Sequence, residues 1–241
     1  MFRRNKNNDD DKTKNVIDDY TRFPVVEAYK LARTNLMFAL AACDKKAFTV
    51  TSWSKSDGKS TVSSNMAITI SKLGKKVLLI DADLRRPNIS NMFKLDNDMG
   101  LTDVLAKFKT FDDVVKKEVI ENLDVITSGV VPPNPSELLG SVAMKDLIEK
   151  QSDNYDYIII DTPPVGVVTD AIMLKDLVAG YLFVIREGST THGDIDKLMQ
   201  IIKIANTQVL GFVEVDCELQ NGKKGKKKGY YSNYYYNNTY Y

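Results

Sequence analysis

The stretch Trp53-Ser-Lys-Ser-Asp-Gly58-Lys59-Ser60-Thr61 follows an apolar run and precedes a helix-like segment, and it decides how this chain folds. Gly58, Lys59 and Ser60 match the end of a Walker A loop, whose backbone N–H groups surround a phosphate. A helix beginning near Lys59 would direct its positive end at that anion. Gly-Lys-Ser alone is common by chance and also occurs as a surface turn with a solvated lysine. Its place between a strand and a helix favours a phosphate-binding loop.

The loop also predicts how a nucleoside triphosphate would be held. Lys59 can reach the β and γ phosphates, and the Ser60 hydroxyl can bind Mg²⁺. Trp53 stands where such loops usually begin with glycine, and it either packs beside the loop or stacks on a base. We expect the ATP contacts to come from Ser56, Asp57, Gly58, Lys59, Ser60 and Thr61.

Short apolar runs alternate with amphipathic segments through the middle of the chain. Several runs are apolar at consecutive positions, which is typical of strands covered on both faces. The alternation predicts an α/β fold with a doubly wound, mostly parallel sheet and helices on both faces, as in P-loop NTPases. The predicted strands are 47–51, 77–80, 123–126, 157–160, 181–185 and 209–213, and the predicted helices are 59–73, 137–150, 169–177 and 194–205.

Two of the predicted strands end in aspartate. Asp81 and Asp83 follow one strand, and Asp161 follows another in a Walker B pattern. One such aspartate could cap a turn, but three carboxylates together with the loop indicate a nucleotide site. We expect a catalytic set of Lys59, Asp81 and Asp83, and Mg²⁺ ligation by Ser60, Asp83 and Asp161. Asp81 is the first choice as proton acceptor, although either Asp81 or Asp83 could take that role.

The composition is that of one α/β domain with polar ends. The chain has 241 residues, of which 43% are hydrophobic and 27% charged, enough to bury a core. We expect a flexible segment at 1–21, the folded domain at 22–219 and a disordered tail rich in lysine and tyrosine at 220–241. No apolar run approaches the roughly 20 residues needed to cross a bilayer, and there is no signal-peptide core, so we expect a cytoplasmic protein.

Together these motifs resemble the bacterial tyrosine kinases of capsular polysaccharide and exopolysaccharide synthesis. The resemblance extends over the loop, both aspartate motifs, Pro132-Pro-Asn-Pro-Ser-Glu-Leu-Leu139, Gly100-Leu101 and Val209-Leu-Gly211. It implies an ATP-dependent, Mg²⁺-dependent protein-tyrosine kinase. It also implies the split form of the family, in which kinase and membrane protein are separate chains.

The resemblance further implies partners. A transmembrane adaptor or polysaccharide co-polymerase would activate the kinase and recruit it to the inner face of the cell membrane, and a phosphotyrosine phosphatase is a further expected partner. Glu27, Lys30 and Arg33 on one helix would contact a neighbour in a ring-like homo-oligomer. The tail of one subunit would enter its neighbour's site, with autophosphorylation in trans on Tyr230, Tyr231, Tyr234, Tyr235, Tyr236, Tyr240 and Tyr241.

Two positions depart from the family pattern. Lys55-Ser56 stands in place of Pro-Gly, and serine suits that place only if its backbone can adopt the conformation that glycine would. Lys30 stands where arginine is usual, which keeps the charge but loses the planar fork. On the same helix we expect Val25, Leu31, Ala32 and Leu36 to pack inward.

Other functions remain as alternatives at this stage. The first is an ATP-driven dimerisation switch of the partitioning-ATPase type without kinase activity, although such proteins carry lysine where this chain has Ser54. The second is a scaffold with impaired ATP binding, which Lys55-Ser56 suggests. Nucleic acid is not an expected partner. The tail is basic and aromatic, but the sequence of the domain does not indicate a groove that would bind nucleic acid together with it.

Overall fold

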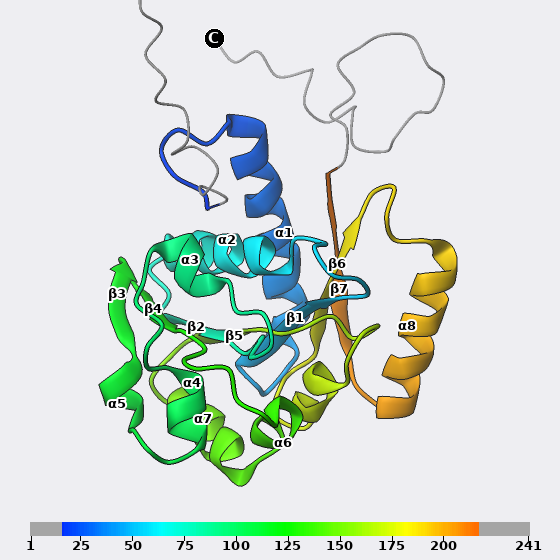
Figure 1. Cartoon of the computed structure of the whole chain (residues 1–241). Coiled ribbons are helices and arrows are strands. Elements are labelled where there is room, and N and C mark those ends of the chain that lie inside the picture. Colours follow the sequence, from blue (N-terminus) through cyan, green and yellow to red (C-terminus); the bar gives the residue numbers. More distant parts are fainter. Residues whose placement is uncertain (1–15, 217–241) are drawn as a thin grey trace, which may run out of the picture.

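The strands form one seven-stranded sheet with the order β3-β4-β2-β5-β1-β6-β7 (Figure 1). The structure is a computed structural model, and it describes residues 16–216. Every neighbouring pair is parallel except β3 and β4, so the predicted doubly wound, mostly parallel sheet is confirmed. The strands are β1 (Ala47–Ser52), β2 (Val77–Asp81), β3 (Lys116–Ile120), β4 (Leu123–Ile126), β5 (Tyr157–Asp161), β6 (Tyr181–Arg186) and β7 (Val209–Val215).

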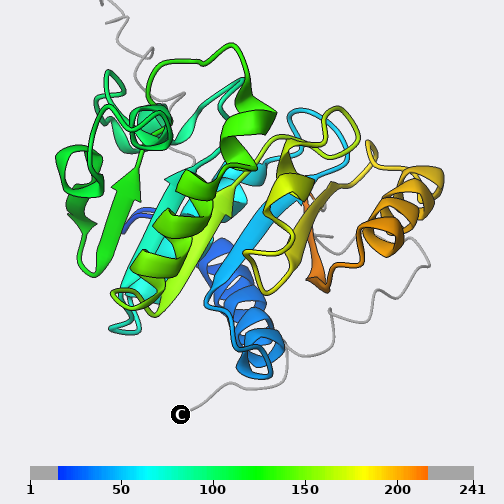
Figure 2. The same cartoon turned by 90° about the horizontal axis from the view of Figure 1, so that it is seen from below.

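Helices cover both faces of the sheet. One face packs against α1 (Phe23–Ala41), α2 (Lys59–Ser71) and α3 (Ile89–Phe93). Figure 2 shows α7 and α8 over the opposite face. That face is covered by α4 (Leu101–Leu105), α5 (Phe111–Val114), α6 (Pro135–Leu139), α7 (Val142–Ser152), the 3-10 helix η1 (Asp170–Leu174) and α8 (His192–Ala205).

The continuous apolar strands are explained by the two layers of helices. In β2, Leu78 and Ile80 join the core on the α7 side, whereas Val77 and Leu79 join the core on the α2 side. Successive side chains of a strand point to opposite faces, so a strand between two helical layers must be apolar at every position. All five residues of β2 are buried.

Some predicted helices differ from the observed ones. The helix predicted at 137–150 is two helices, because the chain turns at Gly140 and Ser141. Ser141 caps α7, its hydroxyl accepting a hydrogen bond from the Met144 amide at 3.3 Å. The helix predicted at 169–177 is only the short η1. The strand β3 and the short helices α3, α4 and α5 were not predicted from the sequence.

The packing of the N-terminal helix α1 differs from the prediction at one residue. Leu36 is buried as predicted, but Leu31 is 43% exposed, so its predicted inward packing is wrong. Ahead of α1, Ile17 is buried and its amide donates to Asn65 Oδ1 on α2 at 2.7 Å. In the described part of the chain, contacts with the domain therefore begin before residue 22. The division at 1–21, 22–219 and 220–241 stays a prediction.

The parallel strands bring the motifs to one edge of the sheet. β5 lies between β1 and β2, and Asp81 is the register partner of Asp161. The carboxyl ends of these strands therefore meet beside the loop that joins β1 to α2, where ligands bind in open α/β sheets. Among residues 16–216, no helix is both long enough and apolar enough to span a membrane.

Candidate nucleotide-binding and catalytic site

The loop between β1 and α2 has the backbone shape of a phosphate cradle. Gly58 caps α2 with φ of 90°, and Ser56 also adopts a left-handed backbone with φ of 64°. Turns of this kind direct consecutive N–H groups to one side, where they bind anions. Asp57 is buried, and its Oδ2 accepts a hydrogen bond from the Ser54 amide at 2.9 Å. Asp57 therefore holds the loop in shape from within.

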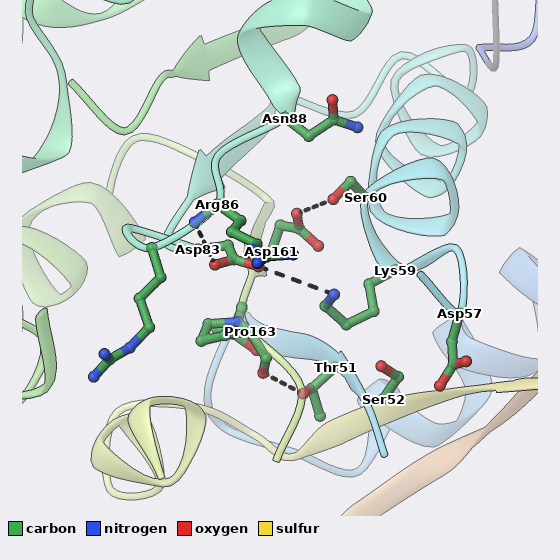
Figure 3. A network of polar contacts seen from close by, with 12 residues as sticks. Thr51, Ser52, Asp57, Lys59, Ser60, Asp83, Arg86, Asn88, Asp161 and Pro163 are labelled. Carbon is green, nitrogen blue, oxygen red and sulfur yellow. Dashed lines mark hydrogen bonds and ion pairs between the residues drawn. The ribbon is translucent and has the colours of Figure 1, made fainter. Parts of the chain in front are cut away.

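Lys59 and Ser60 begin α2 and point toward the ends of β2 and β5 (Figure 3). The Ser60 hydroxyl donates to Asp161 Oδ2 at 2.6 Å, and Lys59 Nζ lies 4.0 Å from Asp83 Oδ2. The Ser63 hydroxyl, one helical turn further along, donates to Asp161 Oδ1 at 2.8 Å. The predicted groups of the loop and of both strand ends thus converge on one place.

Asp81 is held inside the turn that follows β2. Its Oδ2 accepts hydrogen bonds from the amides of Asn88 and Ile89 at 3.1 and 3.0 Å, and its Oδ1 accepts one from the Asp83 amide at 3.3 Å. The side chain is fully buried. Asp81 therefore shapes the turn and the start of α3.

Asp83 has a different setting, because it lines the cavity in front of the loop. Its Oδ1 accepts a hydrogen bond from the Arg86 amide at 3.1 Å, and its Oδ2 faces Lys59. Of the two carboxylates at the end of β2, Asp83 is thus the one that a bound molecule can reach.

The cavity has a volume of about 520 Å³ and is strongly basic. Such a volume falls within the usual range for small-molecule sites, and the positive charge suits a polyphosphate. Its lining residues are Lys55, Ser56, Gly58, Lys59, Ser60, Thr61, Asp83, Arg85, Arg86, Asn88, Pro163, Pro164, Val167, Val168 and Arg186.

Most of the residues predicted for ATP contact, catalysis or Mg²⁺ binding line this cavity, with two kinds of exception. Asp57 is turned into the protein, so only its backbone can contribute to the cradle. Asp81 and Asp161 are fully buried behind the lining. Asp161 still acts on the site through Ser60, to which it is hydrogen-bonded.

Sequence reasoning missed two residues of the site. Ser63 follows Ser60 by three positions on a helix, so the spacing could have placed both hydroxyls on the face toward Asp161. Arg186 ends β6, at the strand edge where ligands bind, and its Nη1 lies 3.0 Å from Asp216 Oδ2. The Arg186 Nε is buried and has no hydrogen-bond partner among the described residues.

The predicted subunit-contact residues lie on α1, away from this cavity. Lys30 Nζ pairs with Glu27 Oε1 at 2.7 Å on the surface. Arg33 instead turns toward α2, and its Nη1 donates to the Thr69 carbonyl at 2.7 Å. The seven tyrosines predicted to be phosphorylated lie outside the described residues.

The electrostatics of the three carboxylates follow from their burial. Burial raises the pKa of Asp161 to about 6, although the charge of Lys59 and the hydroxyls of Ser60 and Ser63 oppose this rise. Burial and the neighbouring charge of Asp161 raise the pKa of Asp81 well above its usual range. Burial also raises the pKa of Asp83 above its usual value, although the charge of Lys59 opposes this rise.

These shifts predict a pH-dependent stability for the ligand-free protein. The unfolded chain releases the Asp161 proton near pH 4, whereas the native protein holds it up to about pH 6. Between these values the native state binds more protons, so Asp161 makes unfolding easier as pH rises. We expect Asp161→Asn to have a higher Tm than the wild type at pH 7.5, with a difference that shrinks toward pH 5. A pH-independent difference in thermal melts would contradict this.

The left-handed backbone of Ser56 gives a second prediction. A β-branched side chain is strained where φ is positive, so Ser56→Val should destabilise the protein by about 1–2 kcal/mol. Ser56→Gly should be neutral or stabilising, because glycine adopts this conformation freely. Thermal melts check this, with Lys55→Val as the matched control, since Lys55 has no positive φ. Equal losses at both positions would show that the backbone of Ser56 is unstrained.

The residues present fit ATP and Mg²⁺. The cradle of the loop, the basic cavity and Lys59 suit the phosphates. The Ser60 hydroxyl and the two carboxylates near it, Asp83 and Asp161, are oxygen ligands of the kind that Mg²⁺ prefers. The sheet, the loop and the carboxylates therefore define the class of the protein as a P-loop nucleotide-binding protein.

Known proteins narrow this class. A family model described as "AAA domain" matches residues 54–210. The tyrosine-protein kinase YwqD of Bacillus subtilis (strain 168) is 39% identical over 208 residues, which cover 86% of this chain and 85% of YwqD. The putative tyrosine-protein kinase CapB of Staphylococcus aureus is 34% identical over 220 residues, covering 91% and 93% of the two chains.

Solved structures support the same similarity to tyrosine-protein kinases. The kinase domain of the Escherichia coli tyrosine kinase ETK superposes with a TM-score of 0.78 at 36% identity, over 85% of this chain and 80% of that one. The septum site-determining protein MinD from Pyrococcus horikoshii, solved with Mg-ADP, is more distant, with a TM-score of 0.59 at 25% identity over 70% and 69% of the chains. This chain belongs to the family of bacterial tyrosine-protein kinases.

Proposed function

We propose that this chain transfers the γ-phosphoryl group of ATP to protein tyrosines, among them those of its own C-terminal tail, and thereby regulates capsule or exopolysaccharide synthesis and export. The observation that carries the proposal is the convergence of Lys59, Ser60, Asp83 and Asp161 at one open, basic cavity. Family membership supports tyrosine as the acceptor.

The geometry supports a division of roles within the site. Asp83 lines the cavity, so we assign it to accept the proton from the tyrosine hydroxyl as the oxygen attacks the γ-phosphorus and the bond to the bridging oxygen breaks, which releases ADP. We prefer Asp83 to Asp81 in this role, because Asp81 is fully buried and accepts three backbone hydrogen bonds. Lys59 and the loop amides would offset the negative charge that develops on the phosphate oxygens.

Mg²⁺ would be held by Ser60, with Asp83 and Asp161 beside it, and when bound it neutralises charge on the phosphates. Asp161 accepts two hydroxyl hydrogen bonds, from Ser60 and Ser63, so its orientation is fixed from α2. At neutral pH the charge of Lys59 favours the ionised form of both carboxylates, the form in which they can bind a cation.

The proposal includes regulation by other chains. We infer that a transmembrane adaptor recruits and activates the kinase at the inner face of the membrane, and that subunits assemble through α1 into a ring. The end of β7 lies beside the cavity, because Asp216 pairs with the cavity residue Arg186 of the same chain.

The proposal is tested by incubating the purified chain with its activator, Mg²⁺ and γ-labelled ATP. Mass spectrometry should find phosphate on the tail tyrosines, and a variant with phenylalanine at all seven should lose this label. Release of inorganic phosphate with dimer formation and no phosphotyrosine would instead favour the ATP-driven switch.

Transfer between subunits is tested by mixing two variants. One carries Lys59→Met and an intact tail, and the other has an intact site and phenylalanine at the seven tail positions. Label on the first variant, which cannot phosphorylate itself, would demonstrate transfer in trans. Label on neither, with the wild type labelled in parallel, would indicate transfer within one chain.

A further inference from the structure

Asp170 is a buried carboxylate that holds three segments together outside the nucleotide cavity. Its side chain is 1% exposed. Arg85 donates to it twice, from Nε at 2.7 Å and from Nη2 at 3.1 Å, and the Ser136 hydroxyl donates at 2.6 Å. Arg85 Nη2 also lies 3.3 Å from Ser136 Oγ. The network thus joins the turn after β2, the start of α6 and the start of η1.

The geometry of this network is restrictive. A guanidinium that binds a carboxylate through two nitrogens is fixed in direction as well as distance, which a single contact would not achieve. Asp170 is buried whereas Arg85 is 42% exposed, so loss of the Arg85 contact would leave the buried carboxylate uncompensated. Pro135 is buried one residue before Ser136, and its fixed φ further limits the motion of this segment.

The network is connected to the proposed base through the main chain. The backbone amides of Arg85 and Arg86 both donate to the Asp83 carboxylate, the latter at 3.1 Å. Because the side chain of Arg85 is anchored on Asp170, these two amides are held in place as well. The orientation of Asp83 toward Lys59 then depends on residues that do not line the cavity.

We propose that Asp170 and Ser136 are positioning residues for phosphoryl transfer, which hold Arg85 and thereby keep Asp83 oriented toward the cavity. The inference rests on the proposed function of Asp83. It also gives a role to Ser136 in the Pro132–Leu139 segment, which the site itself does not use. Through η1 the network links the chain that follows Asp161 to the turn that carries Asp83.

The test compares Ser136→Ala and Asp170→Asn with the wild type under saturating ATP. A displacement of about 1 Å can reduce a rate by up to roughly 100-fold, so we expect kcat to fall about tenfold or more while KM for ATP changes less than about threefold. Ser136→Thr retains the hydroxyl and should restore kcat. The double variant should be little worse than Asp170→Asn, because both act through one network.

The matched control is Glu149→Gln, which breaks the exposed Lys145–Glu149 pair of 3.7 Å on α7 and should leave kcat unchanged. A purely structural network would lower Tm but leave kcat of the folded enzyme unchanged in Ser136→Ala, and that result would overturn the proposal. Failure of Ser136→Thr to restore kcat would overturn it as well.

A measurement without turnover separates this proposal from the proposed function. Hydrogen exchange of the Arg85 and Arg86 amides should be about tenfold faster in Ser136→Ala and normal in Ser136→Thr. If the wild type transferred no phosphate, the kinase function would fail while this exchange result still tested the network. Unchanged exchange in Ser136→Ala would refute the network whatever the activity of the wild type.

Discussion

Replacement of Lys59 by methionine is expected to reduce phosphoryl transfer by on the order of 10²–10³-fold, because the site loses a charge that stabilises the transition state. The Lys59 side chain is only 8% exposed and its Nζ lies 4.0 Å from Asp83. Its charge lowers the pKa of both Asp83 and Asp161. Without it, both carboxylates retain their protons to higher pH, so proton acceptance and cation binding should weaken together.

Single-turnover transfer of labelled ATP measures this loss, and the fluorescence of Trp53, the only tryptophan of the chain, offers a signal beside the loop for nucleotide affinity. Lys72→Met is the matched control, because Lys72 is exposed and caps the far end of the same helix. Equal phosphate label in Lys59→Met and in the wild type would show that transfer does not depend on this loop.

The second large effect is expected at Asp83, where Asp83→Asn should lower kcat by roughly 10²–10⁴-fold, the usual contribution of a general base. Asp81→Asn should cost less than about tenfold. Burial and the charge of Asp161 raise the pKa of Asp81, so the native side chain tends toward the neutral form that asparagine imitates. An asparagine oxygen can also accept the Asn88 and Ile89 amides that shape the turn.

The two variants are compared at saturating ATP, with KM measured for each and with thermal melts to verify folding. The pH profile adds a check, because the wild-type rate should fall as pH drops through the raised pKa of Asp83. If Asp81→Asn were the variant that lost transfer while Asp83→Asn retained it, the base would be Asp81, the first choice from the sequence.

The strand motifs were predictable because their information is local. Val77–Asp81 and Tyr157–Asp161 are short apolar runs that end in a carboxylate, and the parallel arrangement then places Asp81 opposite Asp161. The loop was recognisable for the same reason, since Gly58, Lys59 and Ser60 act through one continuous backbone turn. The helix pattern was less reliable near Gly140, where a cap at Ser141 interrupts the periodicity.

The residues that reach these motifs from other segments were not predictable, because each is brought to the site by the tertiary fold. Arg186 reaches the cavity from β6, and Asp170 meets Arg85 across 85 positions of sequence. Leu31 is predicted from the helix pattern to pack inward, yet it is 43% exposed. Whether a helical side chain is buried depends on which neighbours cover that part of the helix.

The buried strands, the loop and the three carboxylates were predictable from the sequence, because strand burial and phosphate binding are recognised from consecutive residues. That Asp83 faces the cavity and Asp81 does not became visible in the folded chain alone. The two aspartates are two positions apart on one short segment. The turn after β2 buries Asp81 beneath the Asn88 and Ile89 amides and leaves Asp83 beside Lys59, a difference that depends on residues from other segments.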